Sequence, residues 1–195
     1  MARKTQQARA DLRAKLIDIA ERVIAEEGLA AVKARPLAAQ AGCAVGAIYN
    51  VFGDLNDLIL AVNGRTFATL GQEVGEAAAA DALPREALIT LGQAYLQFAV
   101  RHPKRWRALF EVELTADSDV PDWYREELGR LFAYISAPVA RLRPDMPPAE
   151  VGLMTRALFS SIHGIVWLGL ENRVSGVPQD QLERMIEIVL TEFAK

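Results

Sequence analysis

The stretch KARPLAAQAGCAVGAIYNVF, residues 33–52, decides how the first part of this chain folds. Apolar residues recur at helical spacing in its first half. Gly42 ends that run, since glycine readily adopts the left-handed conformation found just past helix ends. A second helical period follows three residues later and carries Ile48 and Tyr49. Two short helices joined by a tight turn containing glycine form a helix-turn-helix, whose second helix can enter the major groove of DNA.

The length of 195 residues, with 51% hydrophobic and 24% charged residues, is that of an ordinary globular protein. No uncharged apolar run reaches the roughly 18 residues that a membrane span needs. Residues 1–15 are polar, unlike a signal peptide. A single cysteine excludes an internal disulfide and fits a reducing compartment. We therefore expect a cytoplasmic protein with no membrane partner.

Charge is unevenly distributed along the chain, whose net charge is −3. Residues 1–60 carry 8 Lys/Arg against 7 Asp/Glu, whereas residues 61–195 carry 14 against 18. The first 22 residues hold 6 basic and 3 acidic side chains. This is a weak electrostatic footprint for a nucleic-acid partner. A solvated helix with mixed charges explains it about equally well.

The spacing of apolar residues predicts helices almost throughout the chain and no strand. Asp54, with Asp57 three residues later, is expected to cap the helix that follows the quoted stretch. The other expected helices cover about residues 5–27, 54–79, 84–101, 104–115, 121–142, 149–172 and 179–194. We therefore expect an all-α protein of about nine helices.

The motif residues also follow the pattern of a known family: Arg35-x-Leu37-Ala38-x-x-Ala41-Gly42, then Gly46-x-Ile48-Tyr49-x-x-Phe52, and Leu58 in the next helix. With these spacings, residues 10–62 resemble the N-terminal domain of TetR-family transcriptional regulators. The resemblance implies a three-helix DNA-binding domain over residues 1–60 and an α-helical effector-binding and dimerisation domain over residues 61–195. The segment from Phe159 to Gly164 resembles the His-Gly signature of the WHG-type subgroup, in which the first residue is usually Trp.

Within the motif, Asn50 is the best candidate for pairing with a base edge, because an amide can bond adenine bidentately. Tyr49 can donate to a phosphate, and basic side chains would position the protein on the backbone. For each polar residue, a half-buried or solvated side chain without a ligand is the simpler alternative. The candidate DNA-binding residues are Lys33, Arg35, Ala44, Val45, Gly46, Ala47, Tyr49 and Asn50.

Four positions depart from the family pattern. Family members commonly carry Thr or Ser where Lys33 stands, Ser at Ala44, His or Tyr at Val51, and Lys at Leu55. Three of the four residues present here cannot donate a hydrogen bond to a phosphate. We therefore expect fewer backbone contacts and a shallower salt dependence than in a typical relative.

The remainder of the chain offers candidates for an effector pocket and for a dimer interface. A small apolar or amphipathic effector is expected to contact Trp106, Phe110, Trp123, Phe132, Met154, His163 and Trp167. The dimer interface is expected to use Leu158, Ile162, Ile165, Val166, Leu182, Met185, Ile186, Val189 and Phe193. For both sets, packing against the chain's own core is the competing explanation.

These features favour a ligand-responsive repressor that binds a pseudo-palindromic operator in double-stranded DNA as a homodimer. The alternative is a helical small-molecule-binding protein whose helix-turn-helix has lost sequence-specific DNA binding. An enzyme is disfavoured, because the chain has only two histidines, His102 and His163, and no glycine-rich phosphate loop or metal-binding motif. We expect no catalysis, no metal and no cofactor.

Overall fold

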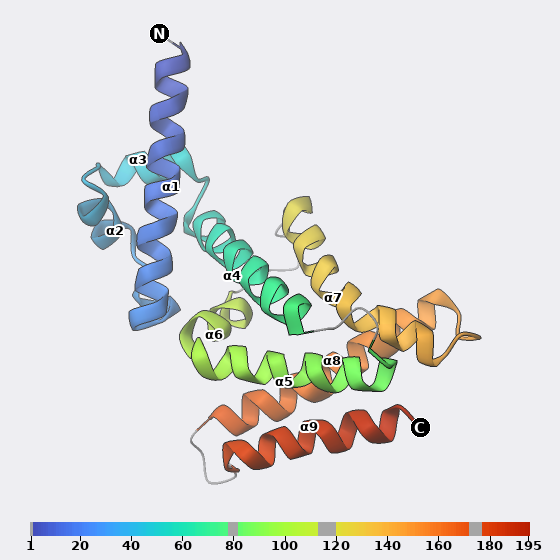
Figure 1. Ribbon diagram of the computed structural model, residues 1–195. Helices are drawn as coiled ribbons and strands as arrows, with labels where there is room; N and C mark the ends of the chain where they lie inside the picture. Colours follow the sequence, from blue (N-terminus) through green and yellow to red (C-terminus); the bar gives the residue numbers. More distant parts are fainter. Residues whose placement is uncertain (1, 78–81, 113–119, 172–176) are drawn as a thin grey trace. The chain divides into compact units, whose positions relative to one another are not determined.

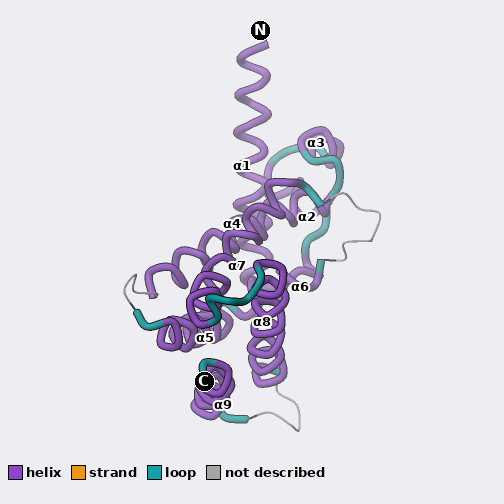
Figure 2. Tube along the Cα trace, turned by 90° about the vertical axis from the view of Figure 1, so that its right-hand side faces the viewer, coloured by secondary structure: helices purple, strands orange, loops and turns teal. Residues whose placement is uncertain are grey.

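The computed structural model describes residues 2–77, 82–112, 120–171 and 177–195. Within these ranges the chain forms nine α-helices, one short 3-10 helix and no strand (Figures 1 and 2). The helices are α1 (Ala2–Glu27), η1 (Leu29–Ala31), α2 (Ala34–Ala41), α3 (Val45–Val51), α4 (Leu55–Ala77), α5 (Pro84–Arg101), α6 (Pro103–Glu111), α7 (Asp122–Leu142), α8 (Pro148–Leu170) and α9 (Gln179–Phe193). The all-α prediction is confirmed. The helix ends expected at residues 79, 115 and 172 lie outside the described residues.

Local chemistry sets the ends of the first helices. Gly28 and Gly42 have φ of 94° and 70°, values that residues with a Cβ rarely adopt, and they terminate α1 and α2. Beyond α2, the amide of Cys43 donates to the carbonyl of Ala38 at 3.0 Å. The predicted cap of α4 is confirmed, because the Asp57 amide donates to Asp54 Oδ1 at 2.8 Å. The Asp57 carboxylate in turn accepts from the amide of Gly53, the residue before the cap, at 2.8 Å, which ties the incoming chain to the first turn of α4.

The described chain divides into two compact units, which are treated separately below. Unit 1 comprises Met1–Phe67 and His102–Tyr124, and unit 2 comprises Ala68–Arg101 and Arg125–Lys195. This division differs from the expected boundary at residue 60, which falls inside α4. The difference arises because α6 joins the first unit. Ala108 of α6 is fully buried in the same core as α1, and its carbonyl accepts a 3.0 Å hydrogen bond from Asn63 Nδ2.

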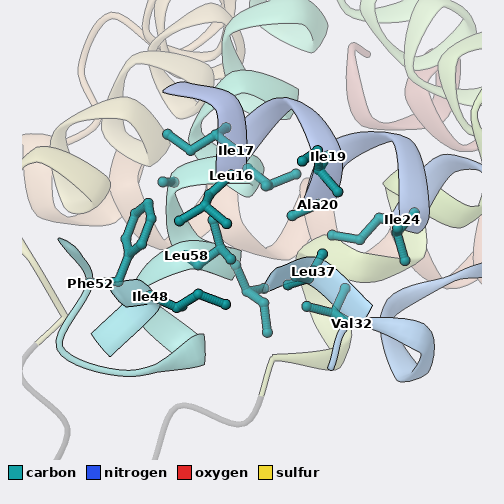
Figure 3. Packing of buried hydrophobic residues seen from close by; sticks show 14 of the residues in the cluster. Leu16, Ile17, Ile19, Ala20, Ile24, Val32, Leu37, Ile48, Phe52 and Leu58 are labelled. Carbon is teal, nitrogen blue, oxygen red and sulfur yellow. The ribbon is translucent and has the colours of Figure 1, made fainter. Parts of the chain in front are cut away.

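The core of unit 1 forms where the apolar face of α1 meets α2, α3 and the start of α4 (Figure 3). Leu16, Leu37, Ile48 and Leu58, one from each helix, have no exposed surface. Each such side chain contributes about 1.5–3 kcal/mol by leaving water. Together they fix α2 and α3 against α1. Because one face of α3 is buried in this way, the residues on its opposite face point to solvent.

Unit 2 is built around the mutual packing of α5, α8 and α9, which lie side by side (Figure 1). Two glycines allow close approach. A Cβ on Gly92 of α5 would lie 2.7 Å from Ile186 Cγ2 of α9, and a Cβ on Gly169 of α8 would collide with Leu182 of α9. Since Leu182 and Ile186 are at most 1% exposed, the missing Cβ atoms create the space that these side chains fill.

Among the described residues, α8 is long and apolar enough to qualify as a membrane span by length and composition. Core helices of soluble proteins meet the same criterion, so a single such helix is weak support for a membrane protein. The bent pair α3 and α4 also qualifies only if both helices are taken as one span.

The close packing of α5 on α9 predicts that Gly92→Ala will destabilise the protein. The added methyl meets two buried side chains, and overpacking of this kind costs about 1–3 kcal/mol. Gly129→Ala, in the interior of α7 with nothing within 4 Å of the added Cβ, is the matched control. It should raise stability by about 0.5–1 kcal/mol through helix propensity. Urea unfolding followed by circular dichroism measures both, and equal shifts would contradict the packing explanation.

Candidate functional site

The short helix α3 separates its residues cleanly between core and solvent. Ile48 is fully buried and Phe52, which caps the helix, is 4% exposed, whereas Tyr49 is 47% exposed. Asn50 is exposed as well. The tyrosine ring therefore lies largely on the solvent side of α3 and is not packed into the core. The outward face of α3 carries a hydroxyl and an amide, the two groups proposed from the sequence to contact DNA.

All eight candidate DNA-binding residues lie in unit 1, from the residue before α2 to the last turn of α3. Ala47 is half-buried and the other seven are exposed. A Cβ added to Gly46 would meet nothing within 4 Å, so packing within the protein does not require glycine there. Space at this position is open to an approaching partner.

Neither motif helix has a side-chain cap at its N-terminus. Lys33 precedes α2 and Ala44 precedes α3, and neither side chain makes a capping hydrogen bond. The first-turn amides of the two helices are therefore not occupied by capping side chains. Val51 and Leu55, the other two atypical residues, are half-buried, and both pack against the core of unit 1.

Charged side chains tie α1 to α4 and α6 within unit 1. The Glu21 carboxylate accepts from Arg65 of α4 at 3.0 Å and from Arg105 of α6 at 2.9 Å. Arg65 also bonds Asp18 at 2.6 Å, and this hydrogen bond raises the arginine pKa, against the opposing effect of burial. Because Glu21 receives both arginines, α4 and α6 are held to the same turn of α1.

Asn63 is a buried polar residue that the sequence reasoning missed. It is fully buried on α4, its Nδ2 donates to the Ala108 carbonyl, and its Oδ1 has no partner among the described atoms. Burial raises the pKa of nearby Tyr124, and a hydrogen bond from Asn63 opposes that rise. The signal was present as a lone amide in the apolar run LILAVNG, residues 58–64. Polar groups left unpaired in a core are uncommon, which makes Asn63 a candidate ligand contact.

Unit 2 contains a row of aromatic residues along one face of α8. The His163 ring stacks on Phe159 with centroids 5.5 Å apart, and Trp167 follows at 5.6 Å. Phe132 of α7 meets Phe159 edge-on at 5.2 Å. Tyr95 of α5 completes the row, since its hydroxyl lies 2.7 Å from His163 Nδ1. We call these five residues the aromatic row. It gathers three of the seven residues expected at an effector pocket.

The other four expected pocket residues lie elsewhere. Met154 is half-buried on α8, but it lies five residues before Phe159 and therefore on a different face of the helix from the aromatic row. Trp106, Phe110 and Trp123 belong to unit 1. Trp106 is 1% exposed and meets Phe110 edge-on at 5.6 Å, while Phe110 and Trp123 are 39% and 42% exposed. The seven residues therefore divide between two units.

Two sequence models of known families match this chain. Residues 16–62 match the model of bacterial regulatory proteins of the tetR family. Residues 88–193, more than half of the chain, match the tetracyclin repressor-like C-terminal domain. The chain belongs to the TetR family. A search of curated protein sequences finds no match.

Solved structures of TetR-like fold agree with this assignment. A TetR transcriptional regulator from Rhodococcus sp. RHA1 is 21% identical, with a TM-score of 0.64 and 96% of each chain covered. RolR in complex with resorcinol is 18% identical, with a TM-score of 0.72, covering 96% of this chain and 89% of that one. FadR from Bacillus subtilis in complex with stearoyl-CoA is 18% identical, with a TM-score of 0.68, covering 91% and 96%. At these identities the likeness is one of fold.

The residues expected at the dimer interface differ in how far the single chain buries them. Leu158, Ile162, Val166, Leu182 and Ile186 are at most 6% exposed in the single chain. In the single chain they are part of the packed core of unit 2. Ile165, Val189 and Phe193 are half-buried, and Met185 is 39% exposed. Periodicity identified the apolar stripes but could not tell which stripe faces inward.

No group of three His, Cys, Asp or Glu side chains able to hold a metal occurs in the part of the chain that the structure describes. Cys43 is half-buried in the turn between α2 and α3, as a small packing residue. The described residues provide no positive sign of catalytic chemistry.

The environment of His163 predicts a pH-dependent stability. Burial lowers its pKa below the ordinary 6.5, so the folded protein binds this proton less readily than the unfolded chain. The contribution of His163 to the free energy of unfolding is therefore fully present above about pH 6.5, the pKa of the unfolded chain. It is lost as the pH falls toward the lower pKa of the folded protein. His163→Asn keeps a polar group opposite Tyr95 but does not titrate. Between pH 7 and 5, wild type should lose more unfolding free energy than this variant, and parallel curves would contradict the prediction.

Proposed function

We propose that this protein is a ligand-responsive repressor that binds a pseudo-palindromic operator as a homodimer and releases it when a small apolar effector binds. The observation that carries the proposal is α3, whose buried face locks the helix onto unit 1 while Tyr49 and Asn50 project into solvent. A polar face on a rigidly packed second helix is the arrangement by which helix-turn-helix proteins read the major groove.

In this scheme the exposed residues of the motif divide by role. Asn50 pairs with a base edge, preferentially adenine, and Val45 and Ala47 offer apolar contact to a thymine methyl. Tyr49, Lys33 and Arg35 contact phosphates and position the helix without specifying sequence. The open space at Gly46 lets the DNA come close to the backbone of α3.

A homodimer supplies the second recognition helix that a short motif needs for tight binding. Two such helices would read half-sites about 34–36 Å apart, one turn of DNA. The exposed apolar residues best placed for the dimer are Leu153 and Leu168 of α8, 69% and 63% exposed, with Met185 and Ile188 of α9, 39% and 47% exposed. Ala157, Ser161 and Gly164 lie between the two leucines and are small enough to let helices approach closely.

The effector is proposed to contact the aromatic row in unit 2. The Tyr95–His163 pair is a hydrogen-bonding group within apolar rings, which suits a small ligand with one polar end. The relatives crystallised with resorcinol and stearoyl-CoA are consistent with ligand binding on this fold. Because α4 supplies residues to both units, a ligand that favours one arrangement of unit 2 would alter the separation of the two recognition helices.

A second candidate function rests on the atypical motif residues. Ala44, Val51 and Leu55 cannot donate to phosphates, and two of the three are half-buried in the core of unit 1. A small-molecule-binding protein without operator recognition would share the same fold. It would bind apolar ligands and dimerise, yet show no preference among DNA sequences.

The test of DNA recognition is selection from randomised duplexes, followed by fluorescence anisotropy with the enriched sequence. We expect a palindrome with half-sites about ten base pairs apart. Asn50→Ala should weaken binding to it by about 2–6 kcal/mol, because each of the two half-sites loses one bidentate base contact worth about 1–3 kcal/mol. Gln179→Ala, an exposed amide at the start of α9, is the control and should leave affinity unchanged. Failure to enrich any sequence would favour the second candidate function.

The proposed dimer surface predicts that Leu168→Glu yields monomers. Placing two carboxylates in an apolar interface disfavours association through desolvation and repulsion. Leu83→Glu is a matched control, because Leu83 is also 63% exposed but lies outside α8 and α9. Analytical ultracentrifugation at micromolar protein should show dimers for wild type and the control and monomers for Leu168→Glu. Dimers in all three would place the interface elsewhere.

A further inference from the structure

The first turns of α1 precede the part of unit 1 that packs into a core. Residues 5–15 are exposed except for half-buried Leu12, and Leu16 is the first fully buried side chain. Figures 1 and 2 show these turns extending past α2 and α3 from both directions of view. The match to the family's N-terminal sequence model begins at residue 16, so residues 2–15, here called the N-terminal extension, lie outside the matched region.

The N-terminal extension is a strongly basic segment of an acidic protein. It carries five basic residues, Arg3, Lys4, Arg9, Arg13 and Lys15, against the single acidic Asp11, a net charge of +4. The chain has a net charge of −3, so residues 16–195 carry −7. Asp11 accepts a 2.8 Å hydrogen bond from Gln7. Arg9, Arg13 and Lys15 form no ion pair with any carboxylate in the part of the chain that the structure describes.

One contact places the base of the extension beside the recognition helix. The Arg13 guanidinium lies over the Phe52 ring, 5.2 Å from its centroid, and Phe52 is two residues beyond Asn50. Stacking orients a guanidinium while leaving its N–H edges free to bond phosphate oxygens. Arg9 lies one helical turn earlier, on the same face of α1. At 1.5 Å per residue, the extension continues about 16 Å from Arg13 to its first residue.

We propose that the N-terminal extension is a second DNA-contacting element, which binds phosphates flanking the bases that α3 reads. The inference rests on the proposed operator binding and adds to it a contact that does not depend on sequence. Ala44, Val51 and Leu55 of the motif cannot donate hydrogen bonds to phosphates. Arg9 and Arg13 of the extension would supply phosphate contacts in their place. The phosphate backbone is the partner that fits, because a net positive helix complements its charge.

The composition of the extension disfavours the other partners that a basic helix can take. Leu12 is its only large apolar side chain after Met1, so it lacks the apolar face by which amphipathic helices enter a lipid interface or a protein groove. Its remaining apolar residues are alanines. Binding would therefore be electrostatic, and it would weaken steeply with salt.

The experiment measures how the dissociation constant depends on salt, using the full-length protein. The ligands are the selected operator and a scrambled duplex of equal length. Each lost phosphate contact lowers the slope of log affinity against log salt by about 0.9. Because a homodimer carries two copies of each substitution, Arg9→Gln/Arg13→Gln removes four contacts, and we therefore expect the slope to fall by about 3.6 on both duplexes, with their affinity ratio unchanged.

Two further double variants serve as controls. Arg130→Gln/Arg141→Gln removes two exposed arginines from α7 and the same net charge, and its slope should match wild type. Arg9→Lys/Arg13→Lys keeps the charge and should keep most of the slope, which separates charge from a change in helix packing. Circular dichroism and melting temperature verify that each variant is folded.

The outcomes distinguish this inference from the proposed function. The role of the extension in DNA binding would be overturned by either of two results. One is a salt slope in Arg9→Gln/Arg13→Gln equal to that of wild type, and the other is an equal fall in the salt slope of the α7 variant. Operator preference that is still abolished by Asn50→Ala would leave the proposed function standing. Conversely, a wild-type protein with no operator preference would overturn the proposed function, while the slope on the scrambled duplex would still decide whether the extension contacts DNA.

Discussion

The burial of Ile48 beneath α3 is the constraint on which the proposed DNA-binding surface depends. Ile48 is enclosed with Leu16 of α1, Leu37 of α2 and Leu58 of α4, and none of the four has exposed surface. A helix of seven residues would not be stable alone in water, so α3 exists because this core holds it. Once Ile48 points inward, the helical repeat turns its two following neighbours, Tyr49 and Asn50, toward solvent. The burial of Ile48 therefore determines that the Tyr49 hydroxyl and the Asn50 amide are the groups exposed on α3.

The same core explains why α6 belongs with the N-terminal helices although 25 residues, 78–102, separate it from the end of α4 in the chain. Ala108 fills the core beside α1, and the Glu21 carboxylate binds Arg105 of α6 as well as Arg65 of α4. These contacts place α4 and α6 on one side of α1. The partly exposed ion pairs add modest energy, so the buried Ala108 and the Asn63 hydrogen bond carry more of the attachment.

In unit 2, helix α8 presents different chemistry on different faces. One face carries Phe159, His163 and Trp167, whose rings stack in succession and reach Tyr95 of α5. Another buries Leu158, Ile162 and Val166 against neighbouring helices. A third leaves Leu153 and Leu168 in solvent. One apolar helix can therefore support packing, a candidate ligand contact and a candidate dimer surface at once, because a period of 3.6 residues separates the three faces.

The sequence by itself determined the all-α class, the helix-turn-helix, the αL glycine after α2 and the Asp54 cap of α4. These features depend on neighbouring residues, and local periodicity and turn chemistry report them directly. It also located the basic excess at the start of the chain. Only the tertiary structure decided that α6 joins unit 1, that Asn63 is buried, and that Leu182 and Ile186 point inward while Ile188 does not. An apolar stripe shows that a helix face is buried but not against what, because that choice is made by segments distant in sequence.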